Sequence, residues 1–285
     1  MTSSARAGLL VLLVSFAPFA QAQTKYERSW ADSLLTEFAL HKQDDARRAA
    51  DLARRASLVL DRAGDPCKAL HIRSLLANYL DRLGAVDSAA VLFLDDRFAR
   101  ITACPAQVQK DYYRFLTNVQ LSLGEFGRVD SVCKRAYDQA ASGALKRTDL
   151  SEVRCNHGIA VASMGRLDDA MQLFRSAYDE ARAHRSAENM TTGLLNMATI
   201  HAMQGNLLAA RGNYEEARDL LRAGGFSDRL VRCYQNLGSI YKDLGDPDKA
   251  IAYQDSAIAL ARASGFLQGE ADATHGLAQI LRERS

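Results

Sequence analysis

Two pairs of side chains combine residue types that proteins use for chemistry. Cys155 and His157 would supply a thiol nucleophile and a base, while Glu37 and His41, four residues apart on an expected helix, would supply two metal ligands. However, residues two positions apart on a helix do not face each other, and His157 falls on an apolar stripe that is expected to be buried. Glu37 and His41 are explained more simply as a surface pair along one helix. We therefore expect neither a catalytic dyad nor a metal site here.

The chain also lacks the short motifs that mark common active sites and cofactor sites. It contains no CxxC, HExxH, GxGxxG or GxxxxGK segment. Its 285 residues are 48% hydrophobic and 25% charged, which is typical of a well-packed folded protein. The formal net charge of +2 gives no electrostatic signature of nucleic-acid binding. We predict a protein that is not an enzyme, needs no cofactor and does not bind nucleic acid.

Residues 1–22 have the pattern of a cleavable signal peptide. Arg6 provides the basic start, the apolar run covers 8–20, and Ala20-Gln21-Ala22 is a small-x-small cleavage site. The run is shorter than the roughly 20 apolar residues that span a bilayer, and no later segment is apolar enough to do so. We expect a mature chain that starts near Gln23, is periplasmic or secreted, and has no stable membrane insertion.

The segment Asn236–Ala261 predicts two amphipathic helices, Leu237–Leu244 and Asp248–Ala261, separated by Gly-Asp-Pro at 245–247. A lone hairpin of this size cannot bury its apolar face, so neighbouring copies are needed.

Such copies are marked by small residues that recur along the chain. Glycines recur at intervals of 40, 41, 40 and 40 residues, at Gly84, Gly124, Gly165, Gly205 and Gly245. Five residues after each glycine stand Ala89, Val129, Ala170, Ala210 and Ala250, and seven residues further stand Asp96, Ala136, Ala177, Ala217 and Ala257. Counting back 40 residues from Gly84 gives Asp44, followed by Ala49 and Ala56 at the same offsets.

This grid predicts one repeat domain over residues 24–285. We expect six repeats at about 26–64, 66–103, 106–143, 147–184, 187–224 and 227–264, with a capping helix at 269–284. His201 takes the position that Tyr241 has in the next repeat, and is therefore expected to be a half-buried core residue.

The sixth repeat resembles the tetratricopeptide pattern. Its motif Tyr234-x2-Leu237-Gly238-x2-Tyr241 is followed by Ala250 and Ala257. The period of about 40 residues is similar to that of the subtype found in kinesin light chains and MalT-type regulators. The resemblance implies an all-α fold, a right-handed α-solenoid of about six helix-turn-helix repeats plus a C-terminal capping helix. In such a superhelix the first helix of each pair lines a concave groove.

The resemblance also implies that the polar stripe of each first helix holds an extended peptide in the groove. The stripe of the sixth repeat and the matching polar positions of earlier repeats are Arg232, Gln235, Asn236, Ser239, Asn78, Arg114, Asn118, Asn156 and Asn196. Asparagine recurs at one position, in 156, 196 and 236, and its amide could bind a peptide backbone without selecting a sequence. The alternative is that these amides bond within the solenoid or face water.

The cysteines suggest two disulfides. Cys67 and Cys104 each precede a first helix beside a proline, so the repeat places them on the same edge of neighbouring units. Cys133 and Cys155 lie on successive helices that pack together in this architecture. Buried free thiols are the alternative for both pairs.

These features favour an exported, non-enzymatic scaffold or adaptor that binds a protein or an extended peptide. A self-associating structural envelope protein, which would form homo-oligomers, is one alternative. A sensory module that acts with a separate signalling partner is another.

Overall fold

The computed structural model describes residues 25, 27–37, 46–93, 101–143, 145 and 150–284. The signal peptide, His41, Asp44 and Asp96 lie outside the described residues. The chain divides into two compact units, Met1–Ala103 and Cys104–Ser285, and the single repeat domain over residues 24–285 stays a prediction. Each unit is described by itself below.

The first unit contains a helix over 27–37, α2 (Ala46–Arg62), α3 (Pro66–Arg82) and α4 (Val86–Val91). The start of α3 is defined by Asp65, whose carboxylate accepts a hydrogen bond from the Lys68 amide at 3.1 Å, and by proline at the first helical position. On α2, Ala49 and Ala56 are fully buried, as the small-residue grid predicts.

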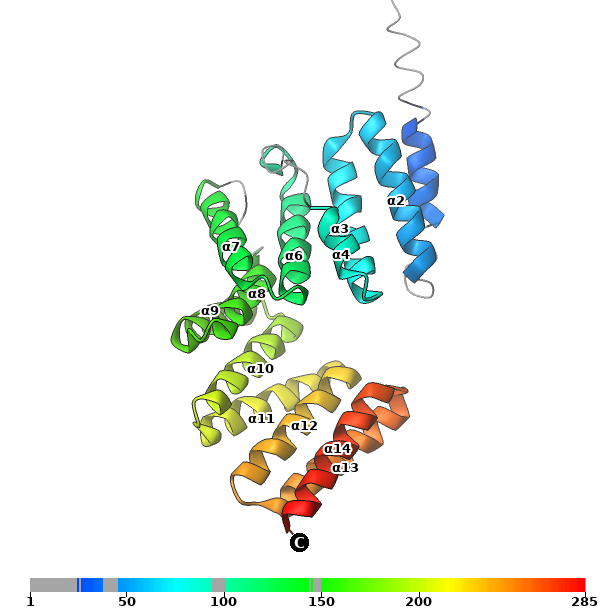
Figure 1. The fold of residues 1–285 in the computed structure, drawn as a ribbon. Helices are drawn as coiled ribbons and strands as arrows, with labels where there is room; N and C mark the ends of the chain where they lie inside the picture. The colour runs from blue at the N-terminus through cyan, green and yellow to red at the C-terminus, as the bar shows by residue number, and fades with distance from the viewer. Residues whose placement is uncertain are drawn as a thin grey trace, which may run out of the picture. The chain divides into compact units, whose positions relative to one another are not determined.

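The second unit is a succession of antiparallel helix pairs (Figure 1). Its described helices are α6 (Ala106–Ser122), α7 (Phe126–Ala141), α8 (Ser151–Ser163), α9 (Leu167–Ala183), α10 (Ala187–Met203), α11 (Leu207–Gly224), α12 (Ser227–Asp243), α13 (Pro247–Ser264) and α14 (Leu267–Arg284). Each helix packs on the next, and α8 also packs on both α6 and α10. The expected all-α repeat fold is confirmed, and the described residues contain no strand.

The helix ends of the second unit follow from local sequence. Gly205 and Gly245 have φ angles of 76° and 78°, a left-handed conformation that a side chain would strain, so the preceding helices end there. After Gly245, the Asp246 carboxylate accepts a hydrogen bond from the Lys249 amide at 3.2 Å and Pro247 opens α13. The predicted stop and restart at 245–247 is therefore present.

Small residues allow the helices to approach closely. The grid alanines Ala170, Ala210 and Ala250 are all fully buried. A Cβ atom on Gly158 would lie 2.4 Å from Cε1 of Phe174, closer than carbon atoms can approach.

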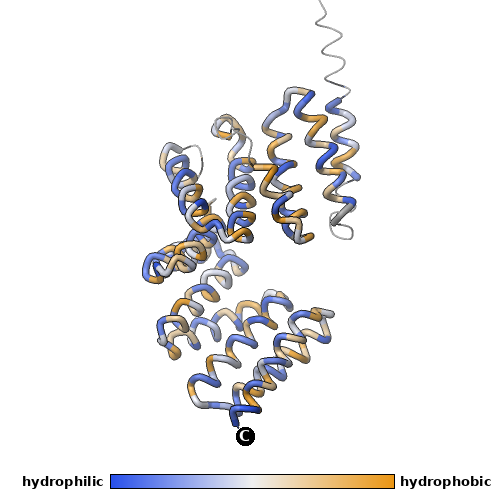
Figure 2. Tube along the Cα trace, viewed as in Figure 1, coloured by the Kyte–Doolittle hydropathy of each residue, from blue (hydrophilic) through white to orange (hydrophobic). Residues whose placement is uncertain are grey.

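Hydrophobic and hydrophilic residues alternate along the helices (Figure 2), as amphipathic faces require. Among the described helices, none has a stretch long and apolar enough to cross a membrane.

Candidate functional site

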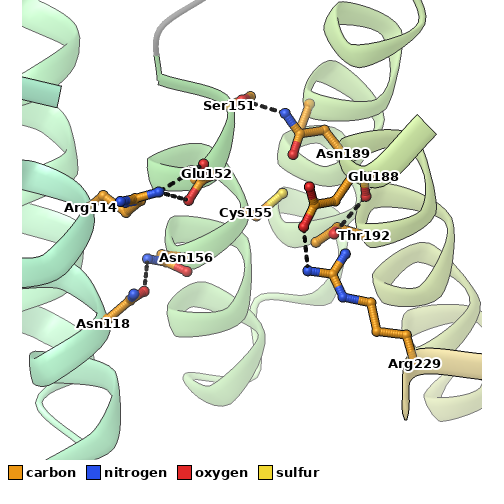
Figure 3. Close-up of a pocket in the computed structure, with 11 residues that line it drawn as sticks. Arg114, Asn118, Ser151, Glu152, Cys155, Asn156, Glu188, Asn189, Thr192 and Arg229 are labelled. Atoms are coloured by element: carbon orange, nitrogen blue, oxygen red, sulfur yellow. Dashed lines mark hydrogen bonds and ion pairs between the residues drawn. The ribbon is translucent and has the colours of Figure 1, made fainter. Parts of the chain in front are cut away.

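A pocket of about 310 Å³ lies in the second unit, on the side formed by the first helix of each pair. Side chains from α6, α8, α10 and α12 converge on it (Figure 3). The lining residues are Arg114, Asn118, Ser151, Glu152, Cys155, Asn156, Ala177, Glu188, Asn189, Thr192 and Arg229. Most of them are polar, and they come from four successive repeats.

One wall of the pocket is formed by an ion pair between α6 and α8. Nη1 of Arg114 donates to both carboxylate oxygens of Glu152, at 3.1 and 3.3 Å, and Nη2 of Arg114 lies 3.3 Å from Oδ1 of Asp111. The guanidinium also lies 4.2 Å from the centroid of the Phe115 ring. These contacts hold the arginine in one orientation.

An amide pair lies beside this wall. Nδ2 of Asn156 donates to Oδ1 of Asn118 at 2.6 Å and to Oγ1 of Thr117 at 2.9 Å. No described residue bonds Oδ1 of Asn156 or Nδ2 of Asn118. The pair therefore offers one acceptor and one donor, which are the complement of a peptide unit. Of the three recurring asparagines, Asn156 is thus bonded within the solenoid, but its Oδ1 has no partner among the described residues.

The opposite wall joins α10 to α12. Nη2 of Arg229 donates to Oε1 of Glu188 at 2.9 Å, and Nδ2 of Asn189 lies 3.5 Å from Oγ of Ser151 on α8. Two arginines and two glutamates line the pocket, so their formal charges cancel. Nε of Arg114 and Nη1 of Arg229 are buried and have no hydrogen-bond partner among the described residues. Buried donors of this kind call for a partner, and a ligand in the pocket is one candidate.

Cys155 borders the pocket but is not an activated nucleophile. Its side chain is almost fully buried, and burial together with the nearby Glu152 raises the pKa of the thiol to about 12. His157 points elsewhere, because its Nε2 lies 2.8 Å from Oδ1 of Asp130 and its Nδ1 lies 3.1 Å from the Tyr137 hydroxyl. The thiol and the imidazole do not form a dyad, in agreement with the expectation that His157 is a buried structural residue.

The structure sorts the groove residues that the sequence predicts. Arg114, Asn118 and Asn156 line the pocket. The predicted residues that do not line it are Asn196, Arg232, Gln235, Asn236 and Ser239, while Asn78 belongs to the first unit. Gln235 has a structural contact instead, since its Nε2 donates to the Gly269 carbonyl of α14 at 2.8 Å.

Five of the predicted residues in the second unit lie outside the pocket because it crosses the first helices obliquely. It contacts the middle of α6, the first half of α8, the start of α10 and only the first turn of α12. A stripe at fixed repeat positions therefore leaves the pocket as the solenoid winds.

For the same reason, the sequence does not predict four residues that line the pocket, Ser151, Glu188, Asn189 and Arg229. The sequence signal that could have found them is complementary side chains about one repeat apart. Arg114–Glu152, Asn118–Asn156 and Ser151–Asn189 are each separated by 38 residues, and Glu188–Arg229 by 41.

The cysteines fall into two groups. Cys67 and Cys104 are both disulfide-bonded, whereas Cys133, Cys155 and Cys233 are buried free thiols. The predicted Cys133–Cys155 bond is therefore absent. Sγ of Cys133 points to the Val153 carbonyl, 3.6 Å away, while Cys155, two residues later on the same helix, faces the pocket.

The Glu37 and His41 metal pair lies partly outside the described residues. Glu37 itself forms an ion pair with Arg48 at 2.6 Å. Within the part of the chain that the structure describes, no group of three or more metal-ligating side chains is present.

Comparison with known proteins supports the repeat interpretation. A family profile described as "Tetratricopeptide repeat" matches residues 189–263. A search of curated protein sequences found no significant match.

Three solved structures have a similar fold. BtubC (BKLC) from P. vanneervenii is 18% identical, with a TM-score of 0.61 over 81% of this chain and 92% of that one. A Rap protein complexed with Competence and Sporulation Factor is 12% identical, with a TM-score of 0.59 over 87% and 73%. The Rap conjugation gene regulator of plasmid pLS20, in complex with the Phr* peptide, is 13% identical, with a TM-score of 0.51 over 92% and 74%. Residues 189–263 thus match the tetratricopeptide repeat family, within a chain that has the fold of helical repeat proteins.

Proposed function

We propose that this protein is an exported, non-enzymatic scaffold whose second unit binds an extended segment of a partner protein in the pocket between α6, α8, α10 and α12. The observation that supports this most directly is the pocket itself, where polar side chains from four successive first helices converge. Its volume of about 310 Å³ is at the lower end for ligand sites, which suits a short stretch of chain.

The chemistry of the pocket favours main-chain recognition. Asn118 and Asn156 leave one amide donor and one amide acceptor unused, which suits a peptide group. The two arginine–glutamate pairs cancel in charge, so the pocket does not select a strongly acidic or a strongly basic segment. A side-chain-independent contact of this kind resembles the way extended peptides are held by main-chain hydrogen bonds.

The comparisons support a peptide as the kind of ligand. Two of the similar structures are Rap proteins complexed with Competence and Sporulation Factor and with the Phr* peptide. Export is proposed from the sequence of residues 1–22 alone, which lie outside the described residues.

A matched pair of double variants tests the groove. The chain from Gln23 to Ser285 is used to select binders from a displayed library of random 12-residue peptides. Asn118→Ala with Asn156→Ala removes both members of the amide pair, so that neither is left buried without a partner. Asn236→Ala with Ser239→Ala removes two exposed polar groups of α12 that do not line the pocket.

We expect the selected peptides to bind the Asn118/Asn156 variant at least tenfold more weakly than the parent, and the Asn236/Ser239 variant equally well. Equal binding by all three proteins would place the interaction outside the pocket. If the chain instead selects no peptide and forms concentration-dependent oligomers in light scattering, the self-associating alternative replaces the scaffold.

A further inference from the structure

A second hollow in the same repeats shares no lining residue with the first pocket. It has a volume of about 210 Å³ and is bordered by α9, α10 and α11 of the second unit. Leu194 and Met197 of α10 are buried at its base. Its other borders include His201, Asn213 and Tyr178, whose hydroxyl donates to Glu216 at 2.8 Å. The hollow thus has an apolar base and a polar rim.

The equivalent place one repeat later is filled by tyrosines. Forty residues beyond Leu194, His201 and Asn213 stand Tyr234, Tyr241 and Tyr253. The rings of Tyr241 and Tyr253 are stacked, with centroids 5.4 Å apart and an interplanar angle of 17°, and the Tyr234 ring lies 5.9 Å from that of Tyr253.

Hydrogen bonds fix these rings. Nη1 of Arg218 donates to the Tyr253 hydroxyl at 2.9 Å, and the Tyr241 hydroxyl donates to Glu215 at 2.7 Å. This part of the solenoid is therefore built to hold a stacked aromatic ring.

The hollow between α9 and α11 arises because all three tyrosines are replaced by smaller side chains. Leu194 replaces one ring, Asn213 replaces the ring that stacks, and His201 retains a flat aromatic surface in place of Tyr241. Nδ1 of His201 is buried and has no partner among the described residues, so the imidazole is not tied to the protein through that atom.

We propose that this hollow binds an aromatic side chain of a partner protein, a tyrosine-like ring that takes the place Tyr253 has in the next repeat. Its volume of 210 Å³ exceeds the roughly 150 Å³ that is sufficient to admit a benzene molecule. The ring would stack on His201 and cover Leu194, while its hydroxyl would reach the polar rim formed by Asn213 and Glu216. This site is separate from the groove between the first helices, and neither proposal depends on the other.

The probe for this site is p-cresol, the side-chain analogue of tyrosine. Binding is followed by NMR of the Met197 and Leu194 methyl groups, which lie at the base of the hollow. We expect saturable shifts with a dissociation constant on the order of 1 mM, a value typical of a weak small-ligand site. Cyclohexanol should give a higher dissociation constant in the same titration, because it cannot stack on His201.

Substitutions at the equivalent positions 213 and 253 of neighbouring repeats provide matched controls. Asn213→Tyr restores the ring of the next repeat and should weaken p-cresol binding at least tenfold. Tyr253→Asn opens the equivalent place one repeat later and should add a second p-cresol site. If Asn213→Tyr folds poorly by circular dichroism, His201→Ala provides the second test, since it removes the stacking surface and should weaken p-cresol binding about threefold or more.

Two capped pentapeptides, one with tyrosine between glycines and one with leucine in its place, test whether the hollow prefers an aromatic side chain. A lower dissociation constant for the tyrosine peptide than for the leucine peptide, from saturation of the Met197 methyl shift, would support an aromatic side chain as the ligand. Equal dissociation constants for both peptides, no shift with p-cresol, or unchanged p-cresol affinity in Asn213→Tyr would overturn the proposal. The Asn118→Ala/Asn156→Ala variant should bind p-cresol as the parent does, which separates this site from the groove.

Discussion

The two faces of α8 are fixed by different physical interactions. One face packs against α9, where Gly158 has no side chain because the Phe174 ring occupies the space. The other face borders the groove, where Glu152 and Asn156 are positioned by hydrogen bonds to Arg114 and Asn118 of the preceding repeat. The first face is constrained by volume, since a larger residue at Gly158 would meet the Phe174 ring. The second face is constrained by pairing, and many residue types fit provided that the partner changes as well.

This difference separates stability from binding. A packing contact cannot be exchanged without strain, since core residues are close-packed. A half-exposed pair contributes little to folding and remains available to a ligand. Substitutions in the groove should therefore change binding more than stability, and substitutions on the packed face the reverse.

The largest effect is expected on the packed face. Gly158→Ala places a methyl group against the Phe174 ring and should lower the free energy of unfolding by about 1–3 kcal/mol, as overpacking usually does. Gly212→Ala is the control, because a Cβ atom there meets nothing within 4 Å, and alanine in a helix should raise stability by up to about 1 kcal/mol. Urea denaturation measures both. Similar changes in the two variants would show that close packing does not constrain this face of α8.

An intermediate effect is expected at the hydrogen bonds between α7 and α8. Burial raises the pKa of Asp130, but the hydrogen bonds from Lys134 and His157 outweigh it, so that the net pKa of the carboxyl is lowered. Arg166 also lies 3.7 Å from Oδ1 of Asp130. A lowered pKa means that the ionised carboxylate stabilises the fold above its unfolded pKa of about 4, and that this contribution is lost as the pH falls through the folded pKa.

Asp130→Asn should therefore cost about 1–2 kcal/mol at pH 7, at the low end of the roughly 1.5–3 kcal/mol of hydrogen bonds to charged groups, because asparagine can still form a hydrogen bond. The variant should also lose less stability than the parent as the pH falls from about 5 to about 2. Asp255→Asn, at an exposed carboxylate, is the control. Urea unfolding across this pH range is the measurement, and parallel curves for parent and Asp130→Asn would contradict the assignment.

The smallest effect on stability is expected in the groove. Arg114 and Glu152 are partly exposed, so a double-mutant cycle with Arg114→Met and Glu152→Gln should give a coupling energy of about 0.2–1 kcal/mol. The same substitutions should alter peptide binding far more than folding. A coupling energy above about 2 kcal/mol would mean that this face of α8 is also structural, and the contrast between the two faces would disappear.

The repeat fold could be predicted because its constraints are steric and local. Gly245, Pro247 and Ala250 report a helix end, a helix start and a close contact, and each depends only on the backbone or on size. The pocket could be predicted only in part, because its position depends on how far each repeat is rotated from the last. The sequence predicts Arg114 and Asn118 at mid-helix, whereas Arg229 lies in the first turn of α12, on the same face but before the start of the predicted stripe at Arg232.

The burial of three thiols also protects the disulfide-bonded cysteines from thiol–disulfide exchange. Disulfide reshuffling requires attack by a thiolate. Burial raises the pKa of both Cys155 and Cys233 to about 12, and it raises that of Cys133 as well, so that almost none of these thiols ionises near neutral pH. Cys67 and Cys104 therefore meet no internal competitor while the chain is folded. In an oxidising compartment, a chain with an odd number of cysteines can form the wrong disulfides. The helical packing suppresses this because it buries the three thiols that have no disulfide partner.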